Sequence, residues 1–514
     1  MHEEGCVIFF LRFTHHQFPP FLSCVVPRTA SLASHVLSPN AQHSTLTTRR
    51  STQNDVRLSV RFSTFIGAAR TNAPISPMFD ALRVPSWRSL SRGALVSFGI
   101  RVAGAGLLYG LHVVLARWME AGGYGTYVFA ISWTSFLAQF GKLGLPNAAL
   151  RFIPEYRTNQ ERGLLRGFLQ TSRGLILAGT AGLALLATVV ALLVPTGDWP
   201  LSALLVGFVL TPLMGLFSFE TQVLRALDHY AWSYAPNYVF RPLATGLGVG
   251  LLLWGTGSVS PLSVLLWSGV VFLMMVGLQQ WGVRRVLAAG STTPERHPRR
   301  WLQIALPLLL TSGFQLILRK TDIFLIGMLV GTDEVGIYFA ALRTAQIATF
   351  SSFAVDAVAA PEVSRLYHGE SDHLQSTVSS LAHWYFWPTL AVALGLTVLA
   401  EPILSLFGAA FTTGVPILLA FMGALVFGAS MGPQLYLLNL TGHERDSAYI
   451  FGLCSVLNIG LNLLGITLYG AFGAALATAT TLIVRSLWIR RRVVALTGIA
   501  PSIWTALQAE SLYE

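Results

Sequence analysis

The sequence predicts an all-α integral membrane protein with about twelve transmembrane helices, each about 20 apolar residues long, in two six-helix pseudo-symmetric lobes. Three observations predict this fold: the composition, the spacing of the apolar runs and a repeat between the two halves. Of the 514 residues, 53% are hydrophobic and only 11% are charged, and the mean hydropathy is +0.59. Because soluble domains carry about 25% charged residues, the composition excludes an ordinary soluble enzyme or binding domain.

The N-terminal region differs from the rest of the chain. Residues 1–77 contain seven Lys or Arg against three Asp or Glu. They have no sustained apolar run, and the short apolar segment "CVIFFLRF" is too short to span a membrane. The start Met-His-Glu-Glu lacks the basic residues of a secretory signal, whereas the scarcity of acidic residues leaves a transit peptide open. We expect residues 1–85 to form a disordered, non-membrane extension, and the working protein to start at or near Met78.

From Gly93 onward the chain consists mainly of long apolar runs. Their lengths and flanking tryptophans are typical of membrane helices, and by that length criterion there are about twelve. The expected spans cover residues 93–116, 124–145, 168–194, 201–224, 236–255, 261–282, 302–330, 335–359, 377–400, 412–438, 447–469 and 471–489. We assign residues 86–295 to an N-terminal lobe, 296–500 to a C-terminal lobe and 501–514 to a cytoplasmic tail.

Positive charges alternate along the connections between these spans. The second and sixth connections are rich in arginine, and Arg490, Arg491 and Arg492 follow the last span, whereas the ninth connection holds only Glu401. Lys and Arg accumulate on the cytoplasmic side of membrane proteins. The pattern therefore predicts a multi-pass membrane protein with both termini in the cytoplasm.

The two halves repeat a short motif in the same relative position. "ARWMEAGGYGTYVFA" (116–130) follows the first span and "GMLVGTDEVGIYFAA" (327–341) follows the seventh, so that Gly125 and Tyr127 match Gly336 and Tyr338. Six spans per half is an even number, so both halves enter the membrane in the same direction. We expect an approximate two-fold axis along the membrane normal.

Three segments carry a resemblance to a known family. "LGLPNAALRFIPEYRTNQERGLLRGF" (143–168), "RKTDIFLIGMLVGTDEVGIYFAA" (319–341) and "EPILSLFGAAFTTGVPILLAFMGALVFGA" (401–429) resemble segments of the polysaccharide and O-antigen flippases. This family belongs to the multidrug/oligosaccharidyl-lipid/polysaccharide exporter superfamily. The resemblance covers residues 90–495 and implies two lobes that open alternately to either side of the membrane.

The same resemblance implies the cargo, the partners and a location in the cell inner (cytoplasmic) membrane. These flippases move undecaprenyl-diphosphate-linked oligosaccharides from the cytoplasmic to the outer leaflet during the synthesis of surface polysaccharides such as lipopolysaccharide O-antigen. The expected partners are this lipid-linked substrate, membrane lipids, a polysaccharide polymerase and glycosyltransferases. No nucleic acid is expected to bind.

Charges inside the seventh span indicate a site. Asp322 lies eleven residues before Asp333, roughly 16 Å along a helix and near the middle of the bilayer. A charge facing lipid at that depth costs at least about 2.5–3.5 kcal/mol, so we expect Arg319, Lys320 and Asp322 to face the protein interior or a water-filled cavity. Arg319 and Asp322 are three residues apart on one helix face and can form an ion pair.

Cations outnumber carboxylates among the charged residues of the spans, which suits an anionic diphosphate cargo. The counterparts of the three charges in the first half are uncharged, so the charges belong to one lobe. We predict a cationic substrate-binding cavity lined by Arg319, Lys320, Arg101, Arg343, Arg241 and Arg151. The candidates for an ion pair or for a coupling proton or sodium ion are Asp322, Asp356 and His383. We expect no other cofactor and no metal site.

Alternative interpretations stay open at this point. A buried Arg319–Asp322 pair could serve helix packing alone, and cytoplasmic orientation already accounts for Arg241. A cation-coupled multidrug or small-molecule exporter of the same superfamily is the alternative function, although it would favour acidic residues in the cavity. A membrane enzyme would need catalytic carboxylates or metal ligands in sizeable loops. The connections contain no HExxH, paired Asp or G-x-S-x-G motif, so we expect no enzymatic activity.

Overall fold

The computed structural model describes residues 92–194, 199–287, 293–350, 352, 355 and 374–510. Within these residues the chain is helical and contains no strand, as the composition predicted. The predicted extension 1–85, the proposed start at Met78 and the candidate Asp356 lie outside the described residues.

The helices of the first half are α2 (Arg92–Gly141), α3 (Leu145–Thr158), α4 (Arg162–Leu193), α5 (Leu201–Ala226), α6 (Tyr230–Ala235), the π-helix η3 (Pro236–Phe240), α7 (Arg241–Thr256) and α8 (Pro261–Val286). Those of the second half are α9 (Pro298–Leu329), α10 (Thr332–Ala345), the 3₁₀ helix η4 (Gln346–Thr349), α12 (Leu374–Val398), α13 (Ala400–Ser405), the 3₁₀ helix η6 (Ala409–Gly414), α14 (Val415–Ser430), α15 (Gln434–Leu440), α16 (Glu444–Thr497) and α17 (Ile503–Glu510).

These elements account for the twelve predicted crossings. Nine helical segments of the described residues are long and apolar enough to cross a membrane. Two of them each hold two crossings, because α2 breaks at Glu120 (φ 57°) and α16 breaks at Tyr469 and Gly470. The remaining crossing begins with α10 and η4, and most of the residues after Phe350 that would complete it fall outside the described part of the chain.

Local chemistry sets several helix ends. Ser260 and Ser263 form a capping box at the start of α8, where Pro261 occupies the first turn and needs no hydrogen-bond acceptor. Gly257 and Gly498 end α7 and α16 in the left-handed region, at φ 69° and 71°, which glycine adopts without steric cost. The sequence therefore stops these helices where the apolar runs end.

The connection between the second and third crossings contains a helix that the span-length criterion does not find. Helix α3 starts after Gly144 and packs against α5 and α9. A Cβ at Gly144 would lie 2.0 Å from the carbonyl oxygen of Ala305, so only glycine permits this approach. Trp301 Nε1 donates to the Tyr156 hydroxyl at 2.9 Å, and burial raises the pKa of Tyr156 so that it stays protonated. The start of α9 is thereby fastened to the first half.

The fifth crossing contains a π-helical turn just before Arg241. Helices α6, η3 and α7 follow one another without a break, and the Arg241 N–H bonds to the carbonyl oxygen of Pro236, five residues back. Pro236 and Pro242 lack an N–H and cannot continue the regular α-helical ladder. Such π-turns recur at functional sites, and this one determines where the Arg241 side chain projects.

The two halves meet at a contact that we call the glycine seam, formed by Gly125 in α2 and Gly336 in α10. A Cβ at Gly125 would lie 1.7 Å from the Thr332 carbonyl oxygen, and a Cβ at Gly336 would lie 2.3 Å from the Ala121 carbonyl oxygen. An offset of 211 residues relates Ala121 to Thr332 and Gly125 to Gly336. The contact is therefore reciprocal, as an axis of two-fold pseudo-symmetry between the lobes requires.

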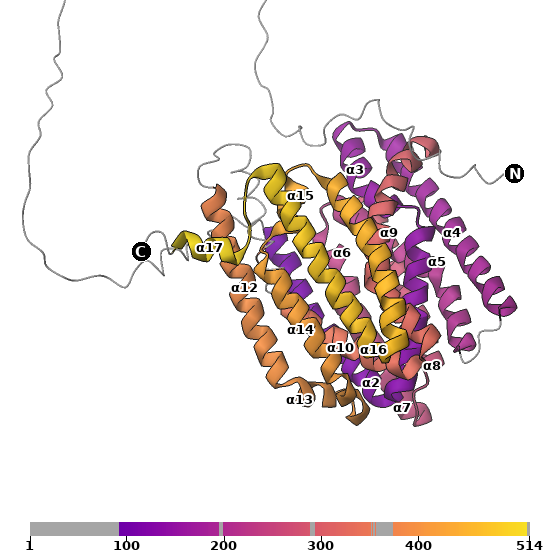
Figure 1. Ribbon diagram of the computed structural model, residues 1–514. Coiled ribbons are helices and arrows are strands. Elements are labelled where there is room, and N and C mark those ends of the chain that lie inside the picture. Colours follow the sequence, from indigo (N-terminus) through magenta and orange to yellow (C-terminus); the bar gives the residue numbers. More distant parts are fainter. Residues whose placement is uncertain are drawn as a thin grey trace, which may run out of the picture. The chain divides into compact units, whose positions relative to one another are not determined.

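The hydrophobic core is shared by the lobes at one end of the bundle and divided at the other. One cluster, near the glycine seam, combines residues of both halves, including Tyr124, Phe129, Tyr338 and Phe411. A second cluster contains α3, α4, α5, α8 and the start of α9, and a third contains α12, α15, α16 and Leu318 of α9. Figure 1 shows α13 at the end with the shared core, and α3 and α15 at the opposite end.

Candidate functional site

Cationic side chains of two helices converge on the ring of Phe339 in α10. Arg343 Cζ lies 4.7 Å and Lys320 Nζ 5.7 Å from the ring centroid, and the His112 ring of α2 lies 5.4 Å away. A cation over an aromatic face is stabilised by the ring quadrupole. We call Lys320, Arg343, His112 and the Phe339 ring the Phe339 cluster; it joins both lobes.

Two hydrogen bonds cross between the lobes beside this cluster. Lys320 Nζ donates to Ser132 Oγ at 3.0 Å, and the hydroxyls of Tyr109 and Thr344 lie 3.1 Å apart. The 211-residue offset of the repeat relates Tyr109 to Lys320 and Ser132 to Arg343, the neighbour of Thr344. Equivalent positions of the repeat thus form the two cross-lobe hydrogen bonds. In these two bonds, the only charged donor is Lys320 of the second half.

A further predicted cation, Arg241, lies in the first half at the start of α7. Its Cζ lies 5.9 Å from the Phe272 ring centroid in α8. The π-turn before α7 places this side chain. Of the predicted cavity residues, Lys320 and Arg343 share the Phe339 ring, whereas Arg241 contacts Phe272 from a third helix.

The expected ion pair between Arg319 and Asp322 is not formed. Asp322 is buried, and its carboxylate accepts hydrogen bonds from the Tyr338 hydroxyl and the Ile323 N–H. Arg319 is exposed, and its Nε donates to the Gln315 carbonyl oxygen of its own helix at 3.2 Å. Asp322 has neutral donors within reach, so it does not need the guanidinium group that the helical spacing offers.

Arg319 lies on the face of α9 opposite to an exposed leucine. Nine residues separate Leu310, which is 61% exposed, from Arg319, so the two side chains project about 180° apart at about 100° per residue. Gln315 and Ser312 lie near Arg319 on this polar face, and Ser312 Oγ accepts a hydrogen bond from Gln139 Nε2 in α2. The polar face of α9 is therefore turned toward the other lobe.

The other predicted residues lie apart from these contacts. Arg101 Cζ lies 4.3 Å from the Tyr234 ring centroid, on the first half of α2. Arg151 is exposed on α3. His383 lies in α12, where its Nδ1 is 3.1 Å from the Ser379 carbonyl oxygen.

Reasoning from charge missed the uncharged residues that organise the site. Phe339, Tyr338 and Ser132 hold the ionic groups but carry no charge themselves. A signal was present for two of them, because Tyr338 and Phe339 follow Gly336 within the repeated motif "GIYFAA".

A buried ion pair lies inside the first half. Arg173 of α4 donates to both carboxylate oxygens of Glu220 in α5, at 2.6 and 2.9 Å. Glu220 is fully buried, and two parallel bonds fix the planar guanidinium group in one orientation. This pair fastens α4 to α5 and is separate from the Phe339 cluster.

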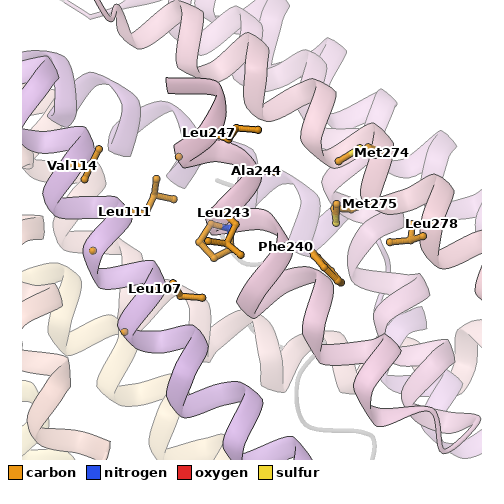
Figure 2. A pocket seen from close by; sticks show the side chains of 14 residues that line it. Leu107, Leu111, Val114, Phe240, Leu243, Ala244, Leu247, Met274, Met275 and Leu278 are labelled. Carbon is orange, nitrogen blue, oxygen red and sulfur yellow. The ribbon is translucent and has the colours of Figure 1, made fainter. Parts of the chain in front are cut away.

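An apolar groove of about 910 Å³ lies between α2, α7 and α8. Figure 2 shows its walls, with Leu107 and Val114 on α2, Leu243 and Leu247 on α7, and Met274 on α8. Leu107 and Val114 project on the side of α2 away from His112. The groove therefore opens on the outer face of the same helix that contributes to the Phe339 cluster.

The fold, with helices that cross the membrane about twelve times in two lobes, is similar to that of solved transporters. It is similar to "Lipid II flippase MurJ, inward closed conformation", at 17% identity over 78% of this chain and 87% of that chain, with a TM-score of 0.59. It is similar to an inward-facing multidrug resistance MATE family transporter of the MOP superfamily, at 14% identity over 79% and 99%, with a TM-score of 0.62. A MOP superfamily transporter from Pyrococcus furiosus, described with a binding pocket of reversed polarity, is 13% identical over 79% and 97%, with a TM-score of 0.52.

The chain belongs to the polysaccharide biosynthesis protein family, whose model matches residues 90–367. No curated protein sequence matches it. The family and the fold agree with the resemblance of the sequence motifs and confirm a multi-pass membrane protein with a flippase or exporter fold.

Proposed function

We propose that this protein flips a lipid-linked oligosaccharide, carried on undecaprenyl diphosphate, across the cytoplasmic membrane by alternating access between its two lobes. Its role is transport, with no chemical step on the cargo. The product would supply a polysaccharide polymerase, and glycosyltransferases would supply the substrate.

The observation that carries this proposal is the Phe339 cluster with Arg241. Among the described residues, no carboxylate lies within 4.0 Å of the charged groups of Lys320, Arg241 or Arg343. Within the same residues, the buried Nε of Arg343 has no hydrogen-bond partner. A partly buried charge without a counter-charge is costly, so an anionic ligand such as a diphosphate is the group that this arrangement suits. A cationic drug would be repelled by it.

The distribution of the core supports alternating access. The arginine-rich connections and the C-terminal arginines lie at the end of the bundle where the cores are divided. If the positive residues mark the cytoplasm, the shared core and the glycine seam seal the outer side. The described conformation would then accept substrate from the cytoplasmic side.

The apolar groove supports a lipid-linked cargo. Its walls are aliphatic, aromatic and sulfur-containing side chains, and the Phe339 cluster includes His112 of α2, the helix that also lines the groove. We infer that an isoprenoid chain rests in this groove on the membrane side while the diphosphate binds between the lobes. Within the bilayer the chain would be held beside the site by van der Waals packing against the groove walls.

Flipping is tested with purified protein in vesicles that contain a defined undecaprenyl-diphosphate oligosaccharide, by following sugar that becomes accessible on the opposite face. Arg343→Gln removes a charge-assisted bond and should slow flipping at least about tenfold. Arg491→Gln, an exposed arginine of α16, is the matched control and should flip at the wild-type rate. Flipping by Arg343→Gln at the wild-type rate, with equal insertion, would remove the cluster from the mechanism.

The groove is tested with two glycine substitutions. Gly110 lines the groove and Gly182 lies on α4, and neither would place a Cβ within 4 Å of another group. Gly110→Phe should fill the groove and reduce crosslinking of a photoreactive polyprenyl lipid, whereas Gly182→Phe should not. Equal crosslinking of both variants would exclude the groove as the chain-binding surface.

A further inference from the structure

The apolar groove of the first half leads, along α8, to an exposed pair of tryptophans. Met274 and Leu278 line the groove (Figure 2), and Trp281 follows Leu278 by three residues on the same helix face. Trp232 of α6 packs on Trp281, with the ring centroids 5.8 Å apart. Trp232 is 40% exposed and Trp281 is 43% exposed. One face of α8 therefore changes from aliphatic to aromatic where the groove ends.

A positive charge is held on this aromatic pair. Arg285 follows Trp281 by one helical turn, and its Cζ lies 3.8 Å from the centroid of the Trp281 ring. Cation–π attraction positions the guanidinium group over the ring and leaves its N–H groups available to an acceptor. Among the described residues, no carboxylate lies within 4.0 Å of the Arg285 guanidinium group. The charge is thus positioned on the surface of α8 without being neutralised.

The depth of this group matches a lipid head group. Arg285 lies at the end of α8, where the arginine-rich sixth connection begins, and such connections mark the cytoplasmic side. Leu278 of the groove lies seven residues earlier, roughly 10 Å farther into the membrane at 1.5 Å per residue. Tryptophan is enriched at the level of the head groups. A lipid chain in the groove would therefore place its phosphate near Arg285.

We propose that Trp232, Trp281 and Arg285, which we call the tryptophan clamp, form a docking site for the diphosphate of a polyprenyl carrier in the cytoplasmic leaflet. The carrier would bind there before its head group enters between the lobes. Arginine suits this ligand, because its planar fork forms two parallel hydrogen bonds to phosphate oxygens. The proposal rests on the proposed flippase function and adds a capture step to it.

The surroundings of the clamp favour the carrier over a membrane phospholipid. A zwitterionic phospholipid carries an ammonium group that needs a counter-charge, and among the described residues Arg285 has no carboxylate within 4.0 Å to provide one. The groove that leads from the clamp is lined by α2, the helix that also carries His112 of the Phe339 cluster. A lipid docked at the clamp is thus held beside the helix that borders the proposed transport site.

The clamp is tested by photocrosslinking to the purified full-length protein in phosphatidylcholine nanodiscs. The probe is undecaprenyl diphosphate with a photoreactive group next to the diphosphate, and mass spectrometry counts crosslinks to residues 278–287. We expect the crosslink yield to saturate with probe concentration. Arg285→Gln should raise the half-saturating concentration at least about tenfold, the loss expected for one charge-assisted bond. Trp281→Leu keeps the charge but removes its aromatic support, and should raise this concentration as well.

Arg284→Gln is the matched control, because Arg284 is also exposed but projects about 100° around the helix from Arg285. It should keep the wild-type half-saturating concentration. Equal losses in Arg284→Gln and Arg285→Gln would indicate general attraction to a basic surface and overturn the clamp. So would unchanged crosslinking in Arg285→Gln. Unlabelled undecaprenyl diphosphate should displace the probe; equal displacement by phosphatidylglycerol or by inorganic pyrophosphate would contradict a site for the carrier.

Vesicle flipping separates docking from crossing. Arg285→Gln should raise the lipid concentration for half-maximal flipping at least about tenfold and keep the maximal rate, because a capture site acts before the crossing step. A lower maximal rate at an unchanged half-maximal concentration would overturn the docking role. The crosslinking probe carries no saccharide and need not flip, so failure of the flippase proposal leaves that result intact. Conversely, flipping that depends on Arg343 but not on Arg285 would remove the clamp alone.

Discussion

The side chains around Phe339 show how a charge can be kept in an apolar protein. Lys320 combines a hydrogen bond to Ser132 with the face of an aromatic ring, and Arg343 combines the same ring with Gln346. Desolvated cation–π contacts are worth about 2 kcal/mol each, which offsets only part of the cost of burying a charge. An arriving anion would meet groups that are already positioned and lack a counter-charge.

Replacing Lys320 tests whether its charge matters. Lys320→Gln keeps a donor for Ser132 but removes the charge, and we expect flipping to fall at least about tenfold. Lys142→Gln is the control, because Lys142 Nζ makes the same kind of bond to Ser218 Oγ, at 3.0 Å, within one lobe. Vesicle flipping rates compare the two variants; equal rates would assign Lys320 to packing.

The Arg173–Glu220 pair predicts an asymmetric response. Arg173→Met leaves a fully buried carboxylate without its partner and should lower the free energy of unfolding by about 3–5 kcal/mol. Glu220→Gln leaves an arginine that is 24% exposed and can reach solvent, so its cost should be smaller. Denaturant unfolding in mild detergent measures both variants, and equal losses would contradict the asymmetry.

Charged residues were the part of the site that the sequence could indicate. The depth of Asp322 correctly predicted its burial, and two of the predicted cations, Lys320 and Arg343, meet at Phe339. The partner of Asp322 could not be predicted, because the spacing of α9 offers Arg319 while Tyr338 arrives from another helix.

At the scale of elements, α10 connects the functional contacts. Its residues form the seam at Gly336 and contact Asp322 and the cations within two turns. The repeated motif predicted this helix and its correspondence to a segment of α2. Both copies hold a glycine because the backbones of the two halves touch there and leave no room for a Cβ. Helix α3 was not predicted by span length, since its 14 residues are amphipathic and too short to cross a membrane.

A methyl group at the seam should separate the lobes. Gly125→Ala would place a carbon 1.7 Å from the Thr332 carbonyl oxygen, whereas carbon–oxygen contacts need about 3.3–3.6 Å. We expect the distance between spin labels on the exposed residues Trp118 and Leu406 to increase by about 1.5 Å or more, the size of that deficit.

Gly336→Ala should behave in the same way, because the contact is reciprocal. Gly99→Ala is the control, since a Cβ there would meet nothing within 4 Å. A spin-label distance in Gly125→Ala that matches the control would show that the seam tolerates side chains.

At the scale of the whole molecule, the alternation of connection charges predicts an orientation. Asn159 follows α3 near the divided cores, and Thr412 lies in η6 near the shared core. With Cys6 and Cys24 replaced by Ser, Asn159→Cys should react with an impermeant thiol reagent only after the cell membrane is opened. Thr412→Cys should react in intact cells. Cys454 is buried and should contribute little background. The reversed pattern would invert the proposed direction of transport.

The pseudo-symmetry has a consequence for how the cargo could change. The repeated halves provide matching backbone surfaces, while Lys320, Arg343 and Asp322 all belong to the C-terminal half. Divergence can therefore act on one half and leave the duplicated scaffold intact. Chimeras that exchange residues 296–500 between family members that transport different polysaccharides should fold stably, because the two lobes meet through matching backbone surfaces. The charged groups that the cargo requires should then be those of the donated C-terminal half.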